Sequence, residues 1–159
     1  MRHVFRRFLS FMALPRTRKR MLAEAAGALL SAWWLVRRKP FRSYCRTLGQ
    51  PHPGEFVDTS NQDMPPQPLG QIRWAVQRVN RLAGGRFTCL MLGIAAKRML
   101  DRRGLANTLV LGVRPDKGDG DDPFGAHAWL RAGRYVVIGL EERAGHIPVA
   151  SYHSDPAQG

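Results

Sequence analysis

The stretch RFTCLMLGIAAKRMLDRRG, residues 86–104, carries the signals of a helix that begins at a cysteine. Thr88 is a favoured N-cap residue, because its hydroxyl accepts a hydrogen bond from an N–H group of the first helical turn. Cys89 then takes the first helical position, and apolar residues recur behind it at helical spacing. Two arginines at 102–103 followed by Gly104 are typical of a helix C-terminus. The stretch therefore predicts a helix that starts at Cys89.

A thiol in this position is a candidate nucleophile. The N–H groups and the positive dipole end of a helix N-terminus lower the pKa of a thiol and favour the thiolate. The same N–H groups can stabilise an oxyanion. Free cysteine is also among the most buried residue types and often only packs. Taken alone, the stretch leaves both roles open for Cys89.

Length and composition indicate one domain of ordinary size with room for an appendage. The chain has 159 residues, of which 44% are hydrophobic, enough for a core. Its two cysteines, Cys45 and Cys89, do not make a disulfide framework. They are typical of reduced thiols, so we expect a cytoplasmic protein.

The positive charge is concentrated near the N-terminus. The net charge is +13, and residues 1–50 contribute +11 of it, with 12 Lys and Arg and the single acid Glu24. Such clusters raise nucleic acid as a partner. No zinc-finger spacing, RNP-like aromatic motif or helix-turn-helix signature accompanies them, so we expect no nucleic-acid partner.

The most hydrophobic segment is MLAEAAGALLSAWWLV, residues 21–36. A late start, the interruption by Glu24 and the basic flank at 37–39 argue against a signal peptide. The segment is shorter than the roughly 20 apolar residues that span a bilayer. It predicts an amphipathic or buried helix that packs on the domain, binds a partner helix or lies on an anionic membrane surface. The apolar positions at helical spacing are Leu22, Ala26, Leu29, Trp33 and Val36.

Composition divides the chain into four regions. Residues 1–50 form a basic N-terminal helical region, and residues 51–69, rich in proline and polar residues, form a linker. A domain is expected over 70–150, followed by a disordered polar tail over 151–159.

Within 70–150 the pattern changes from helical to extended. A helix is predicted over 70–82, with Ile72, Val76, Val79 and Leu82 on one face, and it is ended by a glycine pair. A central strand is predicted over 108–113, and two further strands over 126–131 and 134–138 form a hairpin.

The loop at 114–124 is rich in aspartate, which raises the possibility of a calcium-binding loop. It lacks the acidic final ligand of an EF-hand and has no flanking helices, so we expect a solvated hairpin loop. The aspartates are Asp116, Asp119, Asp121 and Asp122.

A histidine on the predicted hairpin offers a partner for the thiol. His127 alternates with Ala126 and Ala128 and so points to the opposite face of the strand. In a thiol–imidazole pair the imidazole takes the thiol proton and later protonates the leaving amine. A third group usually orients the imidazole and fixes its tautomer.

Several of these elements together resemble the lasso-peptide biosynthesis B protein, a transglutaminase-like cysteine leader peptidase. They are TCL at 88–90, L-x-x-R-G at 100–104 and AHAW at 126–129, and the similarity covers about residues 70–150. The earlier LPRTRKRMLAEAAGALLSAWWLV at 14–36 is similar to the N-terminal helices of that family.

The resemblance implies an α+β, papain-like domain in which the Cys89 helix packs on an antiparallel sheet. It implies removal of the leader from a ribosomally made lasso-peptide precursor, with Cys89 as nucleophile, His127 as general base and acid, and no cofactor. The chain lacks room for a winged-helix recognition domain, which implies the split form. The implied partners are the precursor leader, a separate leader-recognition protein and a lasso cyclase resembling asparagine synthetase, with an anionic membrane surface as a further candidate.

One position departs from that family. Its third catalytic member is typically an Asp about a dozen residues after the histidine, whereas residues 138–142 read IGLEE. Glu141 is the candidate substitute, and a backbone carbonyl or water could equally accept the imidazole N–H.

Other functions remain open on the residues alone. A related acyl-transfer enzyme would use the same Cys89 and His127, and a non-catalytic peptide-binding scaffold would only pack Cys89. A zinc site from Cys89, His127 and His146 is weaker, because it has one thiol and no close-spaced ligand pair. We therefore expect neither metal nor cofactor.

Overall fold

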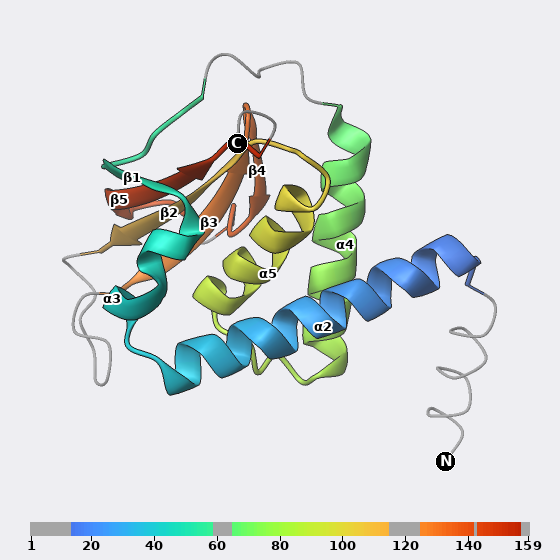
Figure 1. Ribbon diagram of the computed structural model, residues 1–159. Coiled ribbons are helices and arrows are strands. Elements are labelled where there is room, and N and C mark those ends of the chain that lie inside the picture. Colours follow the sequence, from blue (N-terminus) through green and yellow to red (C-terminus); the bar gives the residue numbers. More distant parts are fainter. Residues whose placement is uncertain (1–13, 59–64, 115–124, 142, 157–159) are drawn as a thin grey trace.

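A computed structural model describes residues 14–58, 65–114, 125–141 and 143–156 (Figure 1). Its elements are α2 (Arg16–Arg38), α3 (Phe41–Tyr44), η1 (Cys45–Leu48), β1 (Gln50–Pro53), α4 (Pro66–Leu82), α5 (Cys89–Asp101), β2 (Asn107–Val113), β3 (His127–Ala132), β4 (Tyr135–Ile138) and β5 (Ile147–Ser154).

The strands of the described residues form one antiparallel five-stranded sheet in the order β1-β5-β2-β3-β4. β2 is central, and the short turn between β3 and β4 closes the predicted hairpin. α5 lies against the sheet, and α2 and α4 pack against α5 (Figure 1). This arrangement confirms the predicted α+β class, the three predicted strands and the packing of the Cys89 helix on the sheet.

The core is built around α5. Its buried residues include Ile94, Ala95, Met99 and Leu100, none of which exposes any measurable surface. Such complete burial arises because the sheet covers one side of the helix and α2 and α4 cover the other. At Gly93 an added Cβ would lie 2.7 Å from the side chain of Leu109, so a glycine permits this close approach of α5 to β2.

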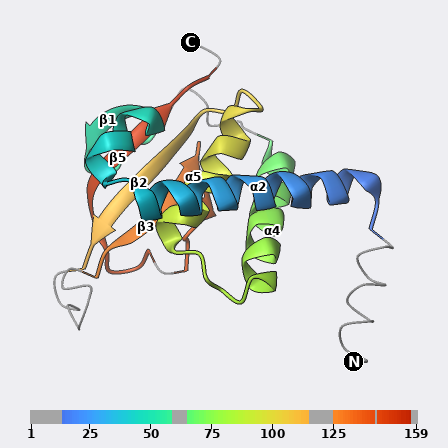
Figure 2. The ribbon, with the colours of Figure 1, turned by 60° about the horizontal axis from the view of Figure 1, so that its bottom comes forward.

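α2 packs across α5 and α4, as both ribbon views show (Figures 1 and 2). This is the first of the three roles that the sequence left open for the segment. The predicted contact face is partly wrong, because Trp33 is 38% exposed. The buried stripe of α2 does not include Trp33, and it contains several small residues, which let α2 approach the neighbouring helices closely. The stripe consists of Leu22, Ala25, Ala28, Leu29 and Ala32.

An ion-pair cluster also fixes α2 to the C-terminal end of α5. The guanidinium of Arg103 donates to both carboxylate oxygens of Glu24, at 2.9 and 2.7 Å. Arg102 approaches the same carboxylate at 3.5 Å. The hydrogen bond from Arg103 lowers the pKa of Glu24. The arginines predicted to end the α5 helix therefore also anchor the N-terminal helix.

The segment expected as a linker, 51–69, is structured at both ends. Gln50–Pro53 is the edge strand β1, paired with β5, and α4 already begins at Pro66. An edge strand tolerates proline because one side of its backbone needs no partner. The backbone N–H of Phe56 donates to the Ser151 hydroxyl at 3.1 Å. Residues 59–64 lie outside the described residues.

The expectation of a disordered tail is wrong for residues 151–154, which complete β5. The Ser154 hydroxyl donates to Asp101 at 2.8 Å and accepts from Lys97, a lysine that is only 1% exposed. Asn107 joins the same network, and its Nδ2 donates to Asp101 at 2.7 Å. These partners are distant in sequence, so the polar composition of the segment gave no sign of them.

The aspartate-rich loop lies outside the described residues from 115 to 124, and so do its four aspartates. Within the ranges that the structure describes, no helix combines the length and the apolar character needed to cross a membrane. The division of the chain into a helical region and a separate domain stays a prediction.

Candidate active site

The N-terminus of α5 has the predicted cap. Thr88 is extended, with φ −71° and ψ 163°, and its hydroxyl accepts from the N–H of Met91 at 3.4 Å. The incoming loop is fixed to α4, because the Phe87 N–H donates to the Asn80 side chain at 3.2 Å. Cys89 follows as the first residue of α5 and is half-buried.

Cys89 lines a cavity of about 340 Å³ between α4, α5 and the end of β4. Polar and cationic side chains of α4 form one wall, and backbone following β4 forms another. The lining residues are Arg73, Gln77, Asn80, Arg81, Cys89, Leu92, Ile138, Gly139, Leu140 and Glu141. The predicted nucleophile is therefore on a surface that a peptide segment can reach.

His127 is the first residue of β3 and is 6% exposed. Its Nε2 lies 3.2 Å from the carbonyl oxygen of Gly139. Its ring also lies near two others, with centroid distances of 5.1 Å to His146 and 6.1 Å to Trp129. Gly139 lines the Cys89 cavity and His127 itself does not, so this hydrogen bond joins the imidazole to a residue of the cavity wall.

Glu141, the candidate third member, lies at the rim of this cavity. Its side chain is 88% exposed, and Oε1 is 3.7 Å from Nη2 of Arg73. The structure thus gives the carboxylate a guanidinium of α4 as its neighbour. Its role beside His127 stays a prediction, and the recorded partner of the imidazole Nε2 is the Gly139 carbonyl.

Glu55, which the sequence analysis missed, supports the strand that carries His127. Its Oε1 accepts from Arg131 at 2.6 Å and from the Trp129 indole at 3.2 Å, and its Oε2 accepts from Arg143 at 3.1 Å. Burial opposes the charge of this carboxylate, but the hydrogen bonds and the two guanidiniums outweigh burial and lower the pKa of Glu55. Glu55 is one of three acids in the proline-rich segment 51–69, and nothing in the sequence of that segment indicated this pairing.

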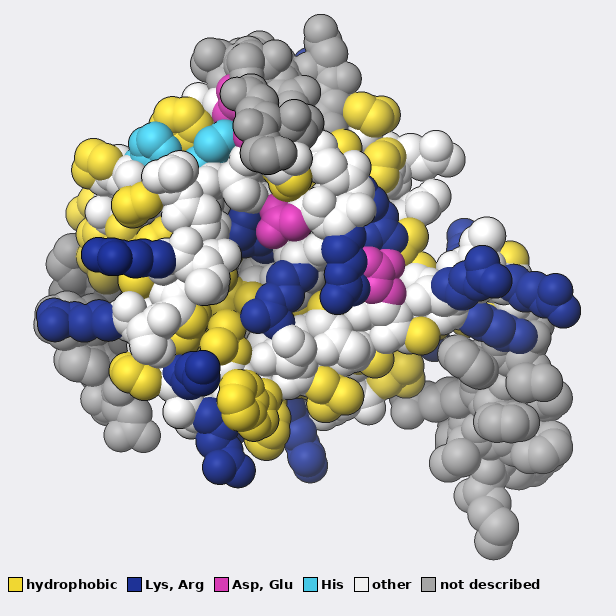
Figure 3. All heavy atoms as spheres, in the orientation of Figure 1, with side chains coloured by type: hydrophobic (Ala, Val, Ile, Leu, Met, Phe, Trp, Pro, Cys, Tyr) yellow, Lys and Arg dark blue, Asp and Glu magenta, His cyan; other side chains and the backbone are white. Residues whose placement is uncertain are grey.

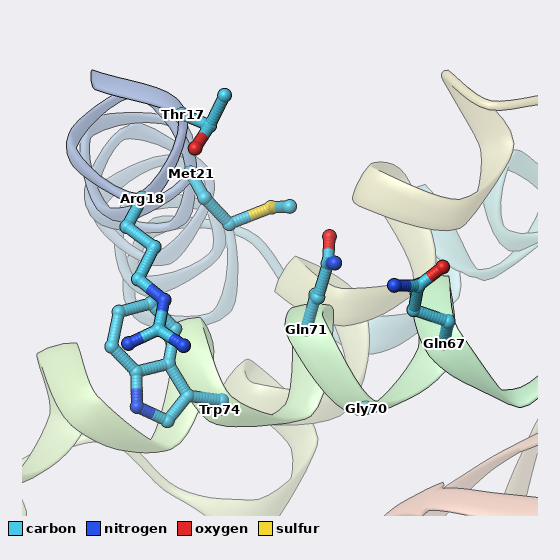
Figure 4. Close-up of a pocket in the computed structure, with 7 residues that line it drawn as sticks. All are labelled: Thr17, Arg18, Met21, Gln67, Gly70, Gln71 and Trp74. Carbon is cyan, nitrogen blue, oxygen red and sulfur yellow. The ribbon is translucent and has the colours of Figure 1, made fainter. Parts of the chain in front are cut away.

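A second cavity, of about 530 Å³, lies between the N-terminal halves of α2 and α4 (Figure 4). The Arg18 guanidinium lies over the Trp74 indole at 5.4 Å, and the side chains of Gln67 and Gln71 stand next to each other on α4 (Figure 4). Among the described residues, its lining contains no cysteine, histidine or acid, so no general base lines the cavity beside the Thr17 hydroxyl.

The other cysteine and the metal hypothesis are not supported as alternatives. Cys45 begins η1, where its Sγ donates to the Arg42 carbonyl at 3.5 Å, and it does not line the Cys89 cavity. Among the described residues, no three His, Cys, Asp or Glu side chains are grouped so that they could hold a metal ion. The zinc set of Cys89, His127 and His146 is thus not assembled there.

Comparison with known proteins identifies one family. The sequence model described as "Transglutaminase-like superfamily" matches residues 26–151. No curated protein and no solved structure matches the chain. The matched range contains Cys89 and His127, and it also includes most of α2 and all of β1.

Proposed function

Since the chain belongs to the transglutaminase-like superfamily, we propose that it is a cysteine peptidase in which Cys89 and His127 form the catalytic pair. The superfamily includes cysteine peptidases and transglutaminases. The observation that carries the proposal is the position of Cys89 at a capped helix start, on the cavity that Gly139 also lines. The Gly139 carbonyl is in turn the hydrogen-bond partner of His127.

In the acylation half of this reaction, the Cys89 thiol gives its proton to His127, and the thiolate attacks the scissile carbonyl carbon. The N–H groups at the start of α5 stabilise the oxyanion that forms, since they lie at the positive end of the helix dipole. The tetrahedral intermediate then expels the amine, which takes the proton from the imidazolium. An acyl-thioester on Cys89 remains.

In the deacylation half, His127 takes a proton from water, and the resulting hydroxide attacks the thioester carbon. The carbon–sulfur bond breaks, and the sulfur of Cys89 recovers the proton. The products are a carboxylic acid and an amine, so one water is consumed per bond cleaved. If an amine replaces water, the same steps yield a new amide, which is the acyl-transfer alternative.

For the substrate, we propose the leader segment of a lasso-peptide precursor, on the strength of the TCL, L-x-x-R-G and AHAW elements. The cavity walls support a peptide substrate: the amides of Gln77 and Asn80 and the guanidinium of Arg81 can bond to backbone carbonyls. A separate leader-recognition protein and a cyclase resembling asparagine synthetase are the proposed partners.

The test is to incubate the chain with candidate precursor peptides, with and without a recognition protein, and to read the product masses. Two fragments whose masses sum to the precursor plus one water support hydrolysis. A product extended by an added amine supports acyl transfer. An unchanged precursor that nonetheless binds the chain supports the non-catalytic scaffold.

We further propose that the protein acts in the cytoplasm and that the outer face of α2 lies on an anionic bilayer. One exposed stripe runs the length of this helix, with arginines at both ends and small or apolar residues between them. It comprises Arg16, Arg20, Ala23, Gly27, Leu30, Trp34 and Arg38. The stripe contains no acid, because Glu24, the one acid of α2, faces Arg103.

The chemistry of this stripe suits a lipid headgroup region more than a protein groove. Leu30 is 62% and Trp34 is 52% exposed, and Lys39 lies over the Trp34 ring at 5.9 Å. Tryptophan beside cations is favoured at the membrane interface, and basic residues are attracted to anionic lipid. Figure 3 shows Lys and Arg gathered at both ends of α2, with bulky hydrophobic side chains at its C-terminal end.

A further inference from the structure

The hydrogen bond between His127 and Gly139 fixes which ring nitrogen carries the proton. A carbonyl oxygen can only accept, so the Nε2 of His127, at 3.2 Å, must donate. In a neutral imidazole whose Nε2 is protonated, the lone pair is on Nδ1. The bond therefore selects the tautomer that offers Nδ1 as the base.

We propose that the peptide carbonyl of Gly139 performs the orienting role that a carboxylate side chain performs in related enzymes. Gly139 is then a positioning residue: it holds the His127 ring and its tautomer, and it acts on the reaction only through that ring. This inference rests on the proposed function, because it assigns the third role at the same Cys89 site.

The position of Gly139 in the chain supports the assignment. It follows His127 by 12 residues, and the resembling family carries its Asp about a dozen residues after the histidine. At this point the chain has a residue without a side chain. The geometry thus supplies a backbone acceptor where a carboxylate is expected.

No side chain fits at position 139 in this conformation. The residue has φ +83°, a region that residues with a Cβ rarely adopt. An added Cβ would lie 2.8 Å from the Ala128 carbonyl, 2.9 Å from the Trp129 Cβ and 3.0 Å from the His127 Nε2. The Gly139 backbone lies directly against the imidazole, and its carbonyl oxygen lies within hydrogen-bond distance of Nε2.

The neighbouring strands hold this carbonyl in place. Ile138, the residue before Gly139, is 3% exposed and pairs with Leu130 of β3. The register between β3 and β4 shifts just after that pair, at Leu130 and Arg131. Such an irregularity redirects the backbone, as β-bulges next to active sites do. The acceptor therefore directly follows a paired residue of the sheet, whereas the Glu141 carboxylate is 88% exposed.

A carbonyl differs from a carboxylate in one chemical respect. It accepts the Nε2 proton in both the neutral imidazole and the imidazolium, but it carries no full charge to stabilise the imidazolium. The Gly139 carbonyl thus retains the orientation of His127, but it stabilises the thiolate–imidazolium ion pair less than an Asp carboxylate would.

The first test reads the tautomer directly in the full chain. Long-range proton–nitrogen correlation NMR with ¹⁵N-labelled histidine distinguishes the two neutral tautomers of His127, after assignment with His127→Ala. The proposal predicts protonated Nε2 above the pKa of the ring. Protonated Nδ1 would overturn it. This reading does not depend on activity.

The second test weakens the acceptor and leaves every side chain in place. The peptide bond between Gly139 and Leu140 is replaced by an ester, by incorporating the α-hydroxy analogue of leucine at position 140. An ester carbonyl is a poorer acceptor, and loss of a bond of ordinary strength predicts a fall in kcat of about fivefold. The pH profile of Cys89 alkylation should also change, which a purely structural role would not require.

The matched control is an ester between Leu140 and Glu141. It weakens the Leu140 carbonyl, which accepts from the Arg143 N–H at 3.4 Å and does not contact His127. The proposal predicts a smaller loss of cleavage in this control and in Glu141→Gln than in the 139–140 ester. A loss of equal size in both esters, or a larger loss in Glu141→Gln, would overturn it.

The outcomes separate this inference from the proposed function. If Cys89→Ala abolishes cleavage but the 139–140 ester cleaves like wild type, the catalytic pair stands and the role of Gly139 falls. If the wild-type chain cleaves no precursor but NMR finds protonated Nε2, the orientation of His127 stands and the peptidase assignment falls.

Discussion

The carboxylate of Glu55 lies 2.6 Å from the guanidinium of Arg131 on β3, four residues after the histidine of the candidate pair. Each of these two side chains is 13% exposed. Glu55 belongs to residues 51–69, which the composition predicted to be a linker, and it is thus fixed to the strand that begins with His127. The strand and the imidazole therefore depend on a contact between residues 76 positions apart.

Glu55→Gln should destabilise the fold by about 2 kcal/mol, because it leaves Arg131 and Arg143 without their carboxylate partner. Urea unfolding of the purified chain measures the change. Glu141→Gln is the matched control, since it removes an exposed carboxylate from Arg73 and should change stability by less than about 0.5 kcal/mol. Equal effects of the two variants would contradict the structural role of Glu55.

The stability that Glu55 contributes should depend on pH. Its pKa is lowered in the folded protein, so the unfolded chain binds this proton more readily than the folded chain. The contribution is present above the ordinary pKa of about 4.3 and is lost as the pH falls through the lowered value. The free energy of unfolding of Glu55→Gln should fall less steeply than that of wild type between about pH 5 and pH 3. Parallel curves would contradict the lowered pKa.

Local signals in the sequence predicted the parts of the fold that depend on neighbouring residues. Thr88 before Cys89 predicted the start of α5, and the apolar run at 108–113 predicted the central strand. The pairing of β1 with β5 joins residues about a hundred positions apart, and neither segment alternates clearly, so no local pattern indicated it.

The predicted site was limited in the same way. Cys89 and His127 are side chains with recognisable chemistry, and the sequence singled out both. The acceptor of the His127 hydrogen bond is a backbone carbonyl at Gly139, and a backbone group has no signature in a sequence. Glu141 is the candidate substitute because residues 138–142, where an Asp is expected, contain glutamates and no Asp, but its exposed side chain lies next to Arg73.

Charge reversal of Arg37, Arg38 and Lys39 to Glu should abolish binding to vesicles of phosphatidylglycerol, if the outer face of α2 lies on an anionic bilayer. Cosedimentation measures this. Wild type should bind these vesicles and not vesicles of phosphatidylcholine. The binding should weaken above about 0.15 M salt, where the screening length falls below about 8 Å.

The control for net charge reverses Arg78, Arg86 and Arg134, three exposed arginines outside α2. This variant should retain most of the vesicle binding. Trp34→Ala should lose more binding than Val149→Ala, which is a matched control because both residues are about half exposed. Wild type that fails to bind, or equal losses in both charge-reversed variants, would contradict the bilayer proposal.

His127→Ala should slow cleavage by about 10²–10⁴-fold, because the thiol loses its base and the leaving amine its acid. In a Cys45→Ser background, where Cys89 is the remaining thiol, the variant should also react more slowly with iodoacetamide below about pH 7. The reaction slows because the variant has no imidazolium to stabilise the Cys89 thiolate, which is the form that reacts. An alkylation profile unchanged by the substitution would show that the two side chains are not partners.

The catalytic role of Cys89 is tested most directly by the masses of a precursor peptide after incubation with wild type, Cys45→Ala and Cys89→Ala, each shown to be folded by circular dichroism. Wild type and Cys45→Ala should give two fragments whose masses sum to the precursor plus one water. Cys89→Ala should leave the precursor intact. A folded Cys89→Ala protein that cleaves at the wild-type rate would contradict the cysteine mechanism.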